Sequence, residues 1–78
     1  MISERDVRTA LQTVVKRDEV WTWDVAFDFR EGTLDSLDHA TLALYLDEHC
    51  GLQIADAELA ELRSIESILA FARRQQDR

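Results

Sequence analysis

Ser36, His39, His49 and Cys50 are the side chains between residues 35 and 50 that offer reactive chemistry. Ser36 and His39 are three residues apart, so on a helix they would be neighbours, as a nucleophile and its base must be. Such a pair also needs an orienting third group and oxyanion donors. No Gly-x-Ser-x-Gly pattern surrounds Ser36, and a chain of 78 residues leaves little room for a cleft. We therefore expect no catalytic residue, and we expect His39 to be half-buried or on the surface.

A metal site is a second possibility, because histidine, cysteine and carboxylate side chains are common ligands. His49 and Cys50 are adjacent, so on a helix they point in different directions, and neither an EF-hand pattern nor a C-x-x-C pair is present. We expect no metal site and interpret Cys50 as a small core residue. A single cysteine excludes an internal disulfide and favours a reducing, cytoplasmic setting. The first residues are charged, unlike a signal peptide, and no apolar run could span a membrane.

A third possibility is that Ser36 is a point of attachment. Asp35 is a good N-cap for a helix that starts at residue 35 or 36, and Asp38 adds negative charge near the positive end of the helix dipole. The free N–H groups of a helix N-terminus favour a phosphate group. Because this domain offers no base to activate the serine, another enzyme would have to form the bond.

The elements that would position Ser36 are helices in a single domain over residues 1–78. Apolar residues at helical spacing predict four of them, with the third one short. The sequence therefore predicts an all-α, four-helix bundle with a long first loop and a short third helix. We expect a first helix over Glu4–Lys16 behind a Ser3–Asp6 capping box, and a second helix over 35–50 that ends before Gly51. We expect a brief third helix capped by Asp56, with Leu59 and Leu62 facing inward. The last helix should be capped by Ser64 and should carry on one face Ile65, Ile68, Leu69 and Ala72.

The long first loop contains an alternating aromatic pattern. One parity holds Trp21, Trp23, Val25, Phe27 and Phe29, which by period alone indicates a half-buried strand. No second strand is available for pairing, and a lone strand is not stable. We therefore predict an extended segment that lays its aromatic side chains into the helical core.

Charge is distributed unevenly along the chain, whose net charge is -7. Residues 18–61 contain twelve acidic residues and one basic residue, which repels nucleic acid and attracts basic protein surfaces. The second helix has one apolar stripe for the core, formed by Leu42, Leu46 and His49 or Cys50. A second stripe among acidic residues is either an exposed protein contact or is covered by a wrapping loop. It comprises Leu37, Ala40 and Leu44, with Asp38, Asp47 and Glu48 around it.

The segment "LDSLDHATLALYLDEHCGLQI" resembles the phosphopantetheine-attachment segment of acyl and peptidyl carrier proteins. Asp35-Ser36-Leu37 is similar to the D-S-L motif of that family, and "LRSIESILAFA" is similar to its last helix. The resemblance covers essentially the whole chain and is strongest over 32–71. Further positions that match are Asp38, Leu42, Leu46, Asp47, Glu48, Gly51 and Ile54.

The resemblance implies a carrier rather than an enzyme. A phosphopantetheinyl transferase would attach 4'-phosphopantetheine from coenzyme A to Ser36, with Asp35 presenting the serine. The arm would hold acyl or aminoacyl thioesters for loading and processing enzymes, which would dock on the exposed stripe and acids of the second helix. A monomer suits this role. The alternative is an unmodified acidic helical adaptor that binds basic protein surfaces.

The chain departs from the family pattern at several positions. Thr33 stands where glycine is common, Thr41 where an acid is common, and Ala55 where proline often precedes the third helix. The aromatic run of the first loop is not a family hallmark. These differences imply a stand-alone carrier, similar to D-alanyl carriers among others, rather than a carrier of general fatty-acid synthesis.

Overall fold

The computed structural model describes residues 2–29, 31 and 34–76. In this part of the chain three α-helices and two 3₁₀-helices occur, and no strand: α1 (Glu4–Val15), η1 (Asp18–Trp21), α2 (Ser36–Cys50), η2 (Asp56–Glu61) and α3 (Ile65–Gln76). The predicted all-α fold with four helices is confirmed, with η2 as the short third helix and η1 as an addition inside the long first loop. Thr33, one of the positions that depart from the family pattern, lies outside the described residues.

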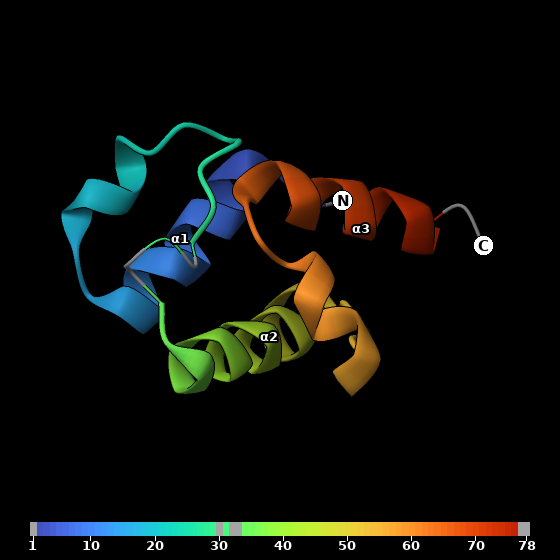
Figure 1. The fold of residues 1–78 in the computed structure, drawn as a ribbon. Coiled ribbons are helices and arrows are strands. Elements are labelled where there is room, and N and C mark those ends of the chain that lie inside the picture. Colours follow the sequence, from blue (N-terminus) through green and yellow to red (C-terminus); the bar gives the residue numbers. More distant parts are fainter. Residues whose placement is uncertain (1, 30, 32–33, 77–78) are drawn as a thin grey trace.

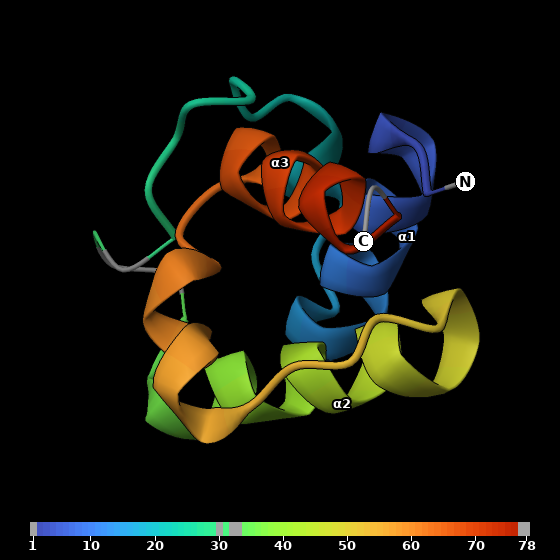
Figure 2. The ribbon, with the colours of Figure 1, turned by 90° about the vertical axis from the view of Figure 1, so that its right-hand side faces the viewer.

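Helix α1 is the central element. It packs against both α2 and α3, and η2 contacts the same two helices. Figures 1 and 2 show α2 on one side of the molecule and α3 on the opposite side, so their outer surfaces face in different directions. One core cluster fills the space between them: Val7, Ala10, Leu11, Val20, Phe29, Leu34, Leu42, Ala43, Leu46, Leu52, Leu62, Ile65, Ile68, Phe71 and Ala72.

Most helix ends lie where local side-chain chemistry predicts them. Ser3 Oγ accepts the N–H of Asp6 at 3.3 Å, and Asp6 Oδ2 accepts the N–H of Ser3 at 2.9 Å, which confirms the capping box. Helix α1 ends one residue earlier than predicted, because Lys16 adopts the left-handed conformation at φ 61°. Helix α2 ends at Gly51, which has φ 71° and suits a residue without a Cβ.

The sequence predicted the cap of α3 correctly but not the cap of η2. The predicted Ser64 cap is confirmed, since its Oγ accepts the N–H of Ser67 at 3.1 Å. The predicted Asp56 cap is wrong, because η2 already includes Asp56 and Ala55 is the cap residue. The Glu58 carboxylate, one turn on, accepts the N–H of Ala55 at 3.0 Å and so supplies the acceptor.

The first loop is less extended than predicted. It begins with η1, in which Val20 is fully buried while Trp21 remains 43% exposed and donates through Nε1 to Gln12 Oε1 at 2.8 Å. Of the five residues expected in the core only Phe29 is fully buried. The Trp23 ring is half-buried against Phe29, with 6.0 Å between ring centroids. Trp23, Val25 and Phe27 are half-buried against the core, so the predicted inward parity is confirmed from residue 23 to residue 29. It fails at Trp21, because this residue lies in η1 and not in an extended segment.

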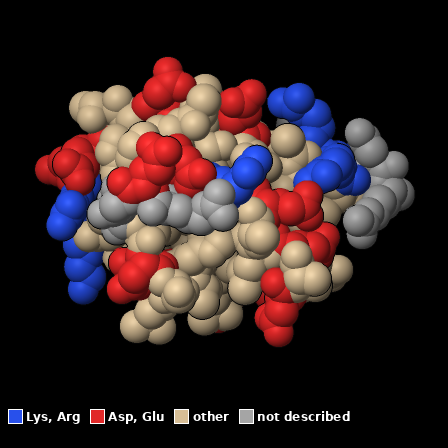
Figure 3. Space-filling model, in the orientation of Figure 1, with Lys and Arg blue, Asp and Glu red and all other residues tan. Residues whose placement is uncertain are grey.

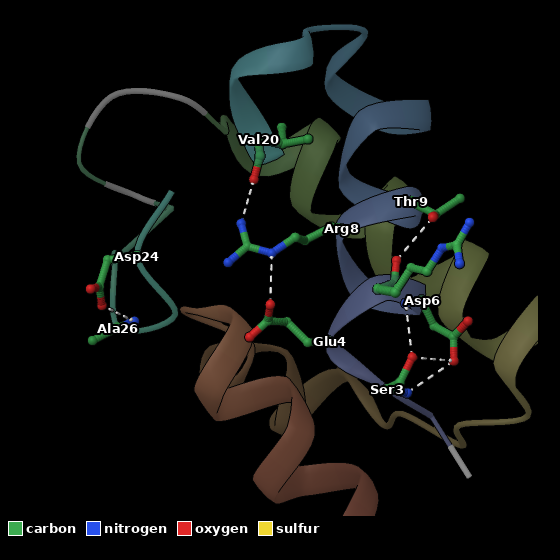
Figure 4. Close-up of polar contacts among 9 residues, drawn as sticks. Ser3, Glu4, Asp6, Arg8, Thr9, Val20, Asp24 and Ala26 are labelled. Atoms are coloured by element: carbon green, nitrogen blue, oxygen red, sulfur yellow. Dashed lines mark hydrogen bonds and ion pairs between the residues drawn. The ribbon is translucent and has the colours of Figure 1, made fainter. Parts of the chain in front are cut away.

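Arg8 fixes this loop to α1, a role that the sequence did not predict. Its guanidinium is buried and donates through Nη1 to the Val20 carbonyl at 2.7 Å and through Nε to Glu4 Oε2 at 3.2 Å (Figure 4). A buried arginine with both partners satisfied ties the loop to the helix beneath it.

Backbone hydrogen bonds connect the end of the loop to the start of α3. The N–H of Phe29 donates to the Arg63 carbonyl at 2.8 Å, and the N–H of Glu66 donates to the Val25 carbonyl at 2.8 Å. The N–H of Leu34 in turn donates to the Phe29 carbonyl at 3.1 Å, so the chain is held just before α2 begins. In the described part of the chain, no helix has the length and apolar character needed to cross a membrane.

Candidate functional site

Ser36 is the first residue of α2, and its side chain is exposed. Two neighbours hold it there: Leu34 is buried in the core, and Asp35 Oδ1 accepts the N–H of Asp38 at 2.8 Å. The Asp35 carbonyl accepts the N–H of His39 at 3.0 Å, which closes the first helical turn. Ser36 is therefore fixed by its backbone while its hydroxyl extends into solvent.

The environment of Ser36 differs from that of the other three serines in the chain. Ser3 Oγ is bonded to Asp6, and the hydroxyls of Ser64 and Ser67 are bonded to each other at 2.9 Å. Among the described residues, the Ser36 hydroxyl has no hydrogen-bond partner. It is therefore the exposed serine hydroxyl that is not already used for a helix cap.

His39 is half-buried and does not form a pair with Ser36. Its Nε2 lies 2.7 Å from the Leu62 carbonyl, and because a carbonyl can only accept, this nitrogen is the donor. The contact joins the first turn of α2 to the end of η2. No hydrogen bond to a carboxylate orients the ring within the described residues, so the arrangement lacks what a Ser–His nucleophile requires.

The remaining candidate ligands do not converge. The His49 ring stacks on Tyr45 with 4.2 Å between ring centroids, and Cys50 is half-buried against the core. Within residues 2–29, 31 and 34–76, no group of three His, Cys, Asp or Glu side chains is arranged to hold a metal ion. Burial, with a smaller contribution from the charge of Asp6, raises the pKa of the Cys50 thiol.

Helix α2 has one buried face and one apolar face that remains exposed. Leu42, Ala43 and Leu46 are buried, whereas Leu37 is 74% exposed and Leu44 is 57% exposed. Ala40, Asp47 and Glu48 are also exposed and Asp38 is half-buried. The possibility that a loop wraps this face is therefore wrong for Leu37 and Leu44. We call the six residues Leu37, Asp38, Ala40, Leu44, Asp47 and Glu48 the α2 patch.

Acidic groups are spread around this part of the surface. Figure 3 shows uncharged surface over the lower side of the molecule, where α2 lies, with acidic groups on both sides of it. Apolar side chains that protrude among like charges are typical of a transient protein contact. The structure thus combines a free serine hydroxyl at a helix N-terminus with an apolar and acidic helix face immediately behind it.

Comparison with protein families assigns the class of protein. Residues 5–72 match the family model described as a phosphopantetheine attachment site. Because this match covers most of the chain, the protein belongs to the phosphopantetheine attachment-site family. It is a carrier with a covalently attached 4'-phosphopantetheine group and not an enzyme. No curated protein and no solved structure matches the chain.

Proposed function

We propose that Ser36 carries the phosphopantetheine group. The single observation that supports this position is that its hydroxyl is exposed and unbonded among the described residues, while the other three serine hydroxyls are engaged in contacts at helix N-termini. The N-terminal end of a 15-residue helix also favours a phosphate group through its free N–H groups and its dipole. The residues present therefore fit the group.

The protein contributes position rather than catalysis. Asp35 fixes the first turn of α2 through its bond to the N–H of Asp38, and so holds the Ser36 hydroxyl at the end of the helix. His39 donates to the Leu62 carbonyl and is not bonded to Ser36, so the base that removes the serine proton belongs to the transferase. When bound, the group supplies a terminal thiol that holds cargo as a thioester.

We assign the α2 patch to partner docking. Leu37, Ala40 and Leu44 offer exposed apolar contacts next to the attachment point, and Asp38, Asp47 and Glu48 offer charges for basic partner residues. The partners would be the phosphopantetheinyl transferase and the enzymes that load and process the cargo. Their docking should be weak and salt-sensitive, since a carrier must release each partner.

The cargo is an acyl or aminoacyl group in fatty-acid, polyketide or nonribosomal-peptide-type biosynthesis. Thr33, Thr41 and Ala55 support a stand-alone carrier outside general fatty-acid synthesis. We further propose that residues 1–78 act as one monomeric domain in the cytoplasm; the lone Cys50, which excludes an internal disulfide, is consistent with that location.

Intact-mass measurement tests the attachment site. The unmodified protein is incubated with a broad-specificity phosphopantetheinyl transferase, coenzyme A and Mg²⁺, alongside Ser36→Ala and the exposed control Ser3→Ala. We expect the mass of one phosphopantetheine to be added to the unchanged protein and to Ser3→Ala, and none to Ser36→Ala. Modification of folded Ser36→Ala would place the attachment elsewhere.

A further inference from the structure

A groove of about 500 Å³ lies where the end of η2 meets α3, and its lining is basic in a chain that is strongly acidic. The lining residues are Glu61, Arg63, Ser67, Ala70, Arg73 and Arg74. Figure 3 shows basic groups gathered over the side of the molecule where α3 ends. We call this feature the α3 groove.

The groove carries an excess of positive charge. Arg74 donates to Glu61 Oε1 at 2.7 Å, which neutralises the one acid in the lining, and its guanidinium lies 5.7 Å from the Phe71 ring centroid. Neither Arg63 nor Arg73 forms an ion pair with any described residue. Arg73 also lines an adjoining hollow with Glu4 and Glu66, again without an ion pair to either. Arg63 and Arg73 are therefore free to meet an anionic group.

The charges lie at the two ends of the groove, and small residues lie between them. Arg63 lies two residues before α3, and Arg73 is eight residues after Ile65, the first residue of the helix, which corresponds to a rise of about 12 Å at 1.5 Å per residue. Ser67 and Ala70 form the floor between them. The Ser67 hydroxyl is already bonded to Ser64, so a bound ligand can lie against Ser67 and Ala70 without forming a hydrogen bond to them.

We propose that the α3 groove binds an acidic segment of a partner protein, with carboxylates near both arginine ends. A rise of about 12 Å corresponds to roughly four extended residues at about 3.3 Å each. Arginine is suited to carboxylates because its planar guanidinium donates two parallel hydrogen bonds. A second copy of this chain is a poor occupant, because two molecules that each carry a net charge of -7 repel one another.

A short acidic segment also fits better than a nucleic acid. A long polyanion would extend past the groove onto a surface in which residues 18–61 carry twelve acids, whereas a segment of about four residues contacts the groove alone. The α2 patch and the α3 groove lie on helices at opposite sides of the molecule (Figure 2).

The experiment is a titration of the full, isotope-labelled chain with a synthetic peptide, followed by amide NMR shifts at low salt. The probe has glutamates at both ends and alanines between them, with blocked termini, and its glutamine counterpart is the blank. We expect the glutamate peptide to shift the amides of Ser67, Ala70 and Arg73, and the glutamine peptide to shift none. Arg63→Gln and Arg73→Gln should each weaken binding by about two- to fivefold, as expected for an exposed ion pair.

Arg5→Gln is the matched control, because it removes the same charge from an exposed position on α1. The proposal holds if binding to this control is unchanged. Equal weakening by Arg5→Gln would show attraction to overall charge and would overturn it, as would shifts confined to other surfaces. Stronger binding of inorganic phosphate than of the peptide at the same amides would also overturn it, because the groove would then select phosphate. The test uses unmodified protein, so it is independent of the attachment at Ser36.

Discussion

At the scale of single residues, function depends on which polar groups are already occupied. The chain has four serines, and three of them serve helix caps or bond to a cap. Ser36 is left free because the preceding residue, Asp35, caps α2 in its place. The capping role and the proposed attachment role are thus divided between two adjacent side chains.

Replacing Asp35 tests this division. Asp35→Ala removes the acceptor for the N–H of Asp38 and should lower the free energy of unfolding by about 1 kcal/mol in urea titrations. Asp35→Asn keeps a capping oxygen and should stay close to the unchanged protein. If Asp35→Asn slows modification of Ser36 as much as Asp35→Ala does, the transferase needs the carboxylate charge at residue 35. If Asp35→Ala leaves the free energy of unfolding unchanged, the capping role of Asp35 is contradicted.

Cys50 should be a poor nucleophile in the folded protein. Burial raises the pKa of its thiol, since the charged thiolate is disfavoured near the core, and the charge of Asp6 adds to this in the same direction. The midpoint of its alkylation with pH should therefore lie higher in the folded protein than in urea. Identical midpoints would refute the shift.

The same shift has a defined sign for stability. The unfolded chain loses the thiol proton first, so the contribution of Cys50 is complete below the unfolded pKa and is lost as pH rises through the folded pKa.

At the scale of elements, α2 has two apolar faces with different uses. Leu42 is fully buried while Leu44, two residues away, is 57% exposed. A leucine side chain therefore contributes to folding at position 42 and is available for binding at position 44. Ala43 and Leu46 complete the buried face.

Matched truncations separate these uses. Leu42→Ala should cost about 2–5 kcal/mol in the free energy of unfolding because it leaves a cavity. Leu44→Ala should change stability by less than about 0.5 kcal/mol. We expect Leu44→Ala to lower kcat/KM of the transferase toward this carrier, measured by intact mass over time; an unchanged kcat/KM would remove Leu44 from the docking surface.

At the scale of the whole molecule, charge rather than shape organises recognition. The net charge of -7 comes from residues 18–61, while both ends of the chain are mildly basic. Folding gathers several of the C-terminal arginines at the α3 groove, while the acids of the α2 patch lie on another helix. Under the two proposals for docking, these surfaces of opposite charge would meet different partners.

Salt should weaken docking at the α2 patch. The Debye length shortens to about 8 Å at 0.15 M ionic strength, so exposed charges attract a basic partner less strongly as salt is added. The KM of the transferase for this carrier should rise with salt while kcat changes little. Asp47→Asn with Glu48→Gln should flatten that dependence, and parallel curves for the two proteins would exclude these acids from docking.

Local chemistry was sufficient to predict most of the helix ends and the exposed position of Ser36 at the start of α2. The Ser3–Asp6 box, the Asp35 cap, the Ser64 cap and Gly51 each depend on residues within one turn, so their types and spacing define the helix ends directly. Helical periodicity also placed Leu37 and Leu44 on a second stripe away from Leu42, but it left open whether that stripe is exposed or covered by a loop.

Contacts between distant residues were decided by the tertiary structure. Arg8 meets the Val20 carbonyl, Phe29 meets the Arg63 carbonyl, and His39 meets the Leu62 carbonyl. These bonds turn the first loop, bury Val20 instead of Trp21, and occupy His39. The alternation of apolar residues could not show this, because it indicates only which side of a regular segment is apolar. The path of a loop depends instead on the backbone hydrogen-bond partners that the rest of the fold supplies. The α3 groove has the same origin, because only the folded chain brings Glu61 to the face of α3 and neutralises Arg74 while Arg63 and Arg73 stay free of described partners.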